Sequence, residues 1–125
     1  MNIIARILVL LVGALFLFLG VGVWFNFDQG LAGFALTVTE PLGRAAMRAD
    51  FAGFFYSIAT FCLLAAWHKS RWWAGAAAIL VGFAISGRAL SILLEGPAPG
   101  GTMPMLVEGG CVAILLFARW VWSRD

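Results

Sequence analysis

Four long apolar segments, separated by shorter polar ones, constrain the fold of this chain more than any other feature. They cover residues 3–25, 48–67, 72–94 and 103–122. Each has about the 20 residues that a helix needs to cross the hydrocarbon core of a bilayer. The sequence therefore predicts an all-α, integral membrane four-helix bundle, formed by residues 1–125 as a single domain.

The composition agrees with lipid as the main solvent of the chain. Hydrophobic residues make up 63% and charged residues 11%, against roughly 45–50% and 25% in soluble domains. A small soluble domain leaves too much of its surface in water to bury that many apolar side chains. The net charge is only +2, whereas a nucleic-acid-binding domain has a strongly basic patch. We expect the lipid bilayer as a partner, and no nucleic acid.

Positive side chains are distributed unevenly between the two sides of the predicted bundle. Four spans place both termini and the polar turn at residues 68–71 on the same side. That side contains Arg6, Lys69, Arg71, Arg119 and Arg124, and the opposite side contains Arg44 and Arg48. Lys and Arg in short loops favour the cytoplasm. The pattern predicts that both termini are cytoplasmic and that the protein lies in the bacterial inner membrane.

The segment between the first two spans, residues 26–39, is a loop rich in apolar side chains. Its glycines, Asn26 and Asp28 argue against a further membrane crossing. We expect it to fold back against the bundle as a short helical turn or a re-entrant piece. Glu40-Pro41 then begins the next helix, because proline is well tolerated at the first helical position.

Small residues recur at intervals suited to close helix packing, which is a main source of association between membrane helices. Gly13 and Gly20 share one face of the first span and predict a close neighbour there. Two further series have a spacing of four, and the last span adds a shorter one: Ala45, Ala49, Gly53 and Ser57; Ala74, Ala78, Gly82 and Ser86; Gly109 and Ala113. We expect these series to seal the bundle internally, with a dimer interface as the alternative.

Six ionisable residues lie toward the end of the bundle opposite the termini. They are Arg44, Arg48, Asp50, Arg88, Glu95 and Glu108. Unpaired charges are costly in a membrane and mark functional sites by default. We expect most of them to converge at one level, with Arg88 paired to Glu108. Such a layer is either an ion-pair network that fixes the bundle or a pocket for an anionic headgroup, a small acid or protons.

Catalytic and metal-binding patterns are missing from the sequence. It contains no GxSxG or HExxH motif and no glycine-rich phosphate loop. His68 is the single histidine, and Cys62 and Cys111 lie in apolar segments without a CxxC partner. The cysteines are expected to be small buried apolar residues. We expect no enzymatic activity, no cofactor and no metal.

Three short motifs suggest a family. Arg48-Ala-Asp-Phe-Ala-Gly53, Gly87-Arg88 and Glu108 give the chain a resemblance, over nearly its whole length, to small bacterial four-helix membrane proteins catalogued only as a domain of unknown function. Ala52-Gly53 stands where that family usually has a Gly-Gly pair. The resemblance implies the four-helix fold and the charged positions, and it implies no activity.

Two functions fit these observations. The first is a non-catalytic accessory or interaction subunit that packs against other membrane proteins or against itself, because the helices offer much contact surface and little chemistry. The alternative is a binding or transport protein that uses Arg48, Asp50, Arg88 and Glu108 around a pocket open to the periplasm.

Overall fold

The computed structural model describes residues 1–97 and 99–124, and the regular structure within them is helical. The elements are α1 (Asn2–Phe25), α2 (Phe27–Ala32), α3 (Pro41–Ala46), a π-helical segment (Met47–Phe51), α4 (Ala52–His68), α5 (Arg71–Glu95) and α6 (Thr102–Ser123). α3, the π-helical segment and α4 follow one another without a break, so they form one long helix, Pro41–His68.

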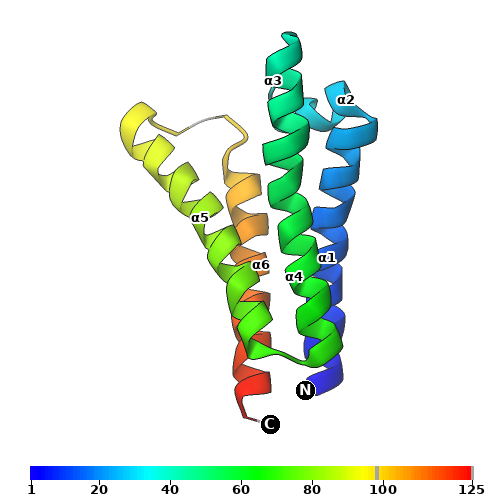
Figure 1. The fold of residues 1–125 in the computed structure, drawn as a ribbon. Coiled ribbons are helices and arrows are strands. Elements are labelled where there is room, and N and C mark those ends of the chain that lie inside the picture. Colours follow the sequence, from blue (N-terminus) through cyan, green and yellow to red (C-terminus); the bar gives the residue numbers. More distant parts are fainter. Residues whose placement is uncertain (98, 125) are drawn as a thin grey trace.

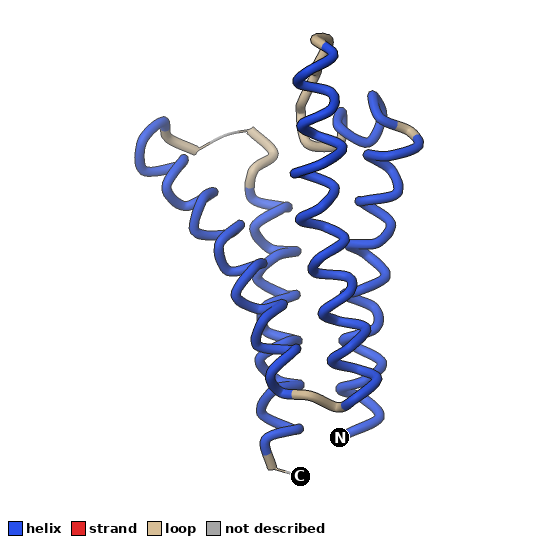
Figure 2. The backbone as a smooth tube through the Cα atoms, in the orientation of Figure 1, coloured by secondary structure: helices blue, strands red, loops and turns tan. Residues whose placement is uncertain are grey.

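Four helices are long and apolar enough to cross a membrane, namely α1, the long helix Pro41–His68, α5 and α6. Each contains one of the predicted spans, which confirms an all-α chain with four candidate transmembrane helices. The two termini lie at the same end of the bundle, close to the turn that joins α4 to α5 (Figure 1). The remaining connections lie at the opposite end (Figure 2).

α1 and α4 pack closely because two glycines of α1 leave room at the contact where a side chain would otherwise stand. A Cβ atom added at Gly13 would lie 3.1 Å from the Cβ atom of Cys62, and one added at Gly20 would lie 2.9 Å from the ring of Tyr56. Real Cβ atoms rarely have neighbours so close. The close neighbour that Gly13 and Gly20 predict is therefore α4.

The first loop folds back as a short helix, in agreement with the expectation from its apolar residues. α2 buries Phe27 and Leu31 against the bundle. Beyond α2, the ring of Phe34 lies 5.0 Å from that of Phe51 and 5.5 Å from that of Phe55, between ring centroids. This aromatic cluster attaches the loop to the start of α4.

The α5–α6 hairpin leaves the α1–α4 pair toward its far end. The buried residues of α5 all lie between Ala74 and Val81, and those of α6 lie between Cys111 and Trp122. Beyond them, α5 leans away from α4 as it approaches its C-terminus (Figure 1). We call residues 82–95 of α5 and 102–110 of α6 the outer hairpin.

The expectation that the small-residue series seal the bundle is wrong for most of their members. Ala45, Ala49 and Ser57 are exposed, and a Cβ atom added at Gly53 would meet nothing within 4 Å. The members of this series lie on the outward face of the long helix both before and after the π-helical segment. The spacing of four thus keeps one face of the helix, but that face points away from the other helices.

Candidate functional site

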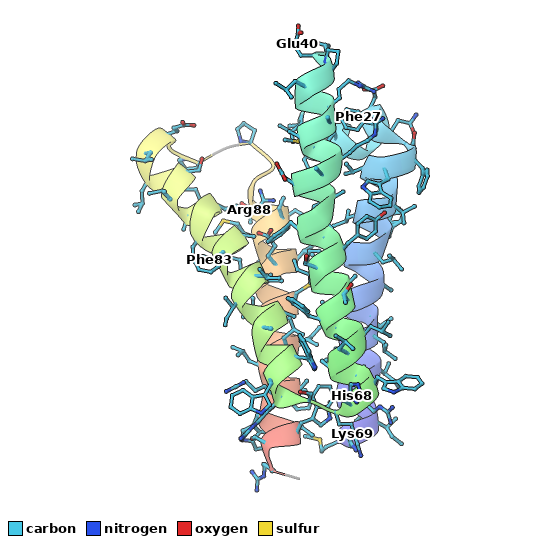
Figure 3. All side chains as sticks on the ribbon, in the orientation of Figure 1. Phe27, Glu40, His68, Lys69, Phe83 and Arg88 are labelled. Carbon is cyan, nitrogen blue, oxygen red and sulfur yellow. The ribbon has the colours of Figure 1, made fainter. Side chains whose placement is uncertain are left out.

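The first group of charges is an ion pair between the two helices of the outer hairpin. Arg88 Nε donates a hydrogen bond to Glu108 Oε1 over 2.7 Å, and the two side chains are 35% and 14% exposed. Arg88 lies on the part of α5 that faces α6 (Figure 3). The pairing of Arg88 with Glu108 is thus as the sequence predicts.

The second group of charges joins α3 and the π-helical segment to α2. Arg44 Nη1 donates hydrogen bonds to Asp28 Oδ1 over 2.9 Å and to the carbonyl oxygen of Val38 over 3.0 Å. The guanidinium carbons of Arg44 and Arg48 lie 4.1 and 4.4 Å from the ring centroid of Phe27. Cation–π contacts of this kind favour the charged side chains beside a buried ring.

Trp24 completes this second group from α1. The backbone N–H of Ala52 donates to the carbonyl oxygens of Ala49 and Met47, three and five residues earlier, and not to that of Arg48, its usual α-helical acceptor. The indole Nε1 of Trp24 donates to the carbonyl oxygen of Arg48 over 2.8 Å. Sequence reasoning missed the roles of Trp24 and Phe27, because aromatic residues near the end of a membrane span are ordinary interface anchors.

The six candidate residues therefore lie at one end of the bundle but do not form one charged layer. Arg44 and Arg48 contact α2, and Arg88 contacts Glu108. Asp50 and Glu95 are exposed and form no ion pair within residues 1–97 and 99–124. The lean of α5 away from α4 explains the separation, since Arg88 lies on the part of α5 that leans away (Figures 1 and 3).

Two cavities also bear on the idea of a charged pocket. A groove of about 560 Å³ lies between the end of α1 and the α3 region, lined by Trp24, Phe25, Pro41, Ala45, Arg48 and Ala49. A second cavity, of about 540 Å³, lies at the end of the bundle that carries the termini. Asp50, Arg88 and Glu108 line neither of them. This geometry does not support a pocket built from all four predicted charges.

The remaining reactive side chains are placed as apolar packing residues. Cys62 and Cys111 are both free and buried, as expected.

The two charged groups both connect helices. The Arg88–Glu108 pair joins α5 to α6, and the Arg44 and Arg48 contacts attach α2 to the long helix. Each group can orient helices, and each leaves charged atoms partly accessible at the surface of the bundle.

Comparison with known proteins gives no further assignment. No protein-family model, no curated protein and no solved structure matches this chain. The resemblance to the family of small four-helix membrane proteins stays a prediction, and function is inferred from the geometry alone.

Proposed function

We propose that this protein is a non-catalytic accessory subunit of the bacterial inner membrane that binds another membrane protein, or a second copy of itself, through the outer hairpin. Four apolar helices with both chain ends at one end of the bundle support a multi-pass placement. The excess of Lys and Arg at that end supports cytoplasmic termini.

The observation that carries the proposal is that the rest of the bundle does not bury the described residues of the outer hairpin. No described residue of 82–95 or 102–110 is buried. Cβ atoms added at Gly82, Gly87, Gly109 or Gly110 would meet nothing within 4 Å. Contact with lipid does not require glycine at these positions. A second helix, in contrast, can approach closely where the residue is glycine. The glycines are therefore best explained by contact with another helix.

The ion pair within the outer hairpin gives a second reason for a protein partner. Arg88 and Glu108 retain accessible surface, and lipid tails cannot hydrogen-bond to the charged atoms that remain exposed. Polar groups on a neighbouring helix can do so. A partner would thus cover both the open glycines and the ion pair.

A bulky side chain at Gly109 is expected to separate assembly from folding. Gly109→Leu adds apolar volume where the chain itself offers no clash, so the isolated protein should stay as stable as wild type. The same side chain should block approach of a partner helix. Native mass spectrometry of gently extracted protein should show a complex for wild type and the single chain for Gly109→Leu.

Ala14→Leu is the matched control, because Ala14 is a small exposed residue on α1. It should leave the complex intact. A wild-type protein that is extracted as a single chain, or a complex that Gly109→Leu leaves unchanged, would refute an interface at the outer hairpin.

A further inference from the structure

The end of the bundle that carries the termini holds a cluster of positive charges that are paired with no carboxylate of the described residues. Its members are Arg6, Lys69, Arg71, Arg119 and Arg124. The ion pairs found among residues 1–97 and 99–124 are Arg44–Asp28 and Arg88–Glu108, both toward the other end. Five of the six acidic residues lie in the segments of that other end, and the sixth, Asp125, is outside the described residues. No described carboxylate neutralises the cluster.

Three of the five cations have visible structural roles. Arg6 Nε donates to the carbonyl oxygen of Ala66 over 3.0 Å, near the end of α4. Arg119 Nη1 donates to the carbonyl oxygen of Arg71 over 3.0 Å. Arg124 lies over the ring of Trp120, with its guanidinium carbon 4.8 Å from the centroid. These contacts account for Arg6, Arg119 and Arg124 without a ligand.

Lys69 and Arg71 differ from these three because they line a cavity at this end of the bundle, which Arg6, Arg119 and Arg124 do not. Both are exposed, and no residue in the described part of the chain accepts a hydrogen bond from either side chain. Arg71 lies over the ring of Trp72, with its guanidinium carbon 4.7 Å from the centroid. The backbone of Lys69 has a positive φ of 49°, and Ser70 Oγ accepts a hydrogen bond from the backbone N–H of Trp73. The turn thus holds two cations whose N–H donors remain available.

These two cations line the cavity of about 540 Å³ at this end. Its walls are residues 68–72 of the turn together with Trp122 and Ser123 of α6. Trp122 is held in place because its Nε1 donates to Asn2 Oδ1 over 2.8 Å. His68 and Lys69 lie at the foot of the bundle, far from Glu40 (Figure 3). The cavity therefore combines an ammonium, a guanidinium, an imidazole and two hydroxyl groups with aromatic walls.

We infer that this cavity binds the phosphate of an anionic phospholipid headgroup from the cytoplasmic leaflet. Basic pockets at the cytoplasmic ends of transmembrane helices suit such headgroups, and that leaflet is rich in anionic lipid. A lipid fits better than a soluble anion because exposed Trp67, Trp72 and Trp120 surround this end, and tryptophan concentrates at headgroup depth. The site lies at the opposite end from the outer hairpin, and the inference rests only on the membrane placement and orientation proposed above.

The test is native mass spectrometry of the purified full-length protein, titrated with phosphatidylglycerol or phosphatidylcholine of the same chain length. Wild type should bind phosphatidylglycerol more tightly. Each Lys or Arg contributes about 1 kcal/mol to anionic lipid binding, so Lys69→Gln with Arg71→Gln should weaken phosphatidylglycerol binding roughly 30-fold. Lys69→Gln keeps a non-glycine residue at the positive φ, which leaves the backbone cost of the turn unchanged.

Two matched variants separate the site from general charge effects. Arg124→Gln removes the same charge as Arg71→Gln at the same end but outside the cavity, and it should weaken phosphatidylglycerol binding clearly less than Arg71→Gln does. Lys69→Arg with Arg71→Lys keeps both charges and should keep the preference for phosphatidylglycerol.

Three results would overturn the inference. They are equal binding of the two lipids by wild type, an equal loss with Arg124→Gln, and displacement of phosphatidylglycerol by millimolar inorganic phosphate. The last would make the cavity a site for a soluble anion.

Discussion

Glu108→Leu is expected to destabilise the bundle by roughly 2–3 kcal/mol, as an unpaired cation within a membrane helix does. The change removes the ion-pair partner of Arg88, whose Nε–Oε1 distance is 2.7 Å in the wild-type protein. A guanidinium does not lose its charge by releasing a proton, so Arg88 stays charged and must seek water at the membrane surface. Unfolding of the purified protein by denaturing detergent measures the free energy of unfolding directly.

The double variant Arg88→Leu with Glu108→Leu should recover most of that stability, because apolar replacement of both partners is often neutral. Glu95→Leu is the matched control, because Glu95 is an exposed carboxylate of the outer hairpin that forms no ion pair with a described residue. This substitution should change the free energy of unfolding little. The single variant Arg88→Leu completes the comparison. If the stability losses of Arg88→Leu and Glu108→Leu simply add in the double variant, the ion pair does not couple α5 to α6.

Gly30→Ala is expected to destabilise the protein by roughly 2 kcal/mol, within the usual range for overpacking. A Cβ atom at Gly30 would lie 2.7 Å from the carbonyl oxygen of Gly22 and 2.8 Å from its carbonyl carbon. Both are backbone atoms of α1 and cannot rotate away, so α2 must move. Phe27 and Leu31 would then leave the core, and Arg44 and Arg48 would lose the ring of Phe27. Thermal unfolding in mild detergent measures the loss.

Gly33→Ala provides the contrast only three residues away. The nearest atom to its added Cβ is the carbonyl oxygen of Gly30 at 3.7 Å, an ordinary contact, and its φ is −61°. Alanine fits there and restricts the unfolded chain, so we expect an unchanged or slightly higher stability. Equal destabilisation by the two substitutions would contradict the tight α1–α2 contact.

Helix positions and one ion pair were predictable from the sequence, because each depends on local properties. Apolar length predicts the four long helices, and their even number predicts that the termini share one end. Gly13 and Gly20 predict a close neighbour, which is α4. The cost of an unpaired charge in lipid predicts the contact of Arg88 with Glu108. In each case a single physical requirement allows only a few arrangements of the chain.

The division of the charged residues into two groups was not predictable, because it depends on helix direction. The spacing of Arg48 and Arg88 along their helices gives similar depths but no lateral distance. That distance is set by the lean of α5 (Figure 1) and by packing that ends at Val81. The π-helical segment has no sequence signature of its own. Trp24 and Phe27 both contact Arg48 in the π-helical segment. Their roles therefore could not be predicted without that segment.

Photo-crosslinking in native membranes tests the central claim most directly, namely that the outer hairpin binds another protein. A photoreactive residue placed at Val107 of α6 or at Leu17 of α1 replaces apolar side chains of similar exposure, 42% and 49%. We expect Val107 to crosslink to a protein, either a second copy or a different chain, and Leu17 to crosslink to lipid. Crosslinks to lipid alone from both positions would contradict the proposed function.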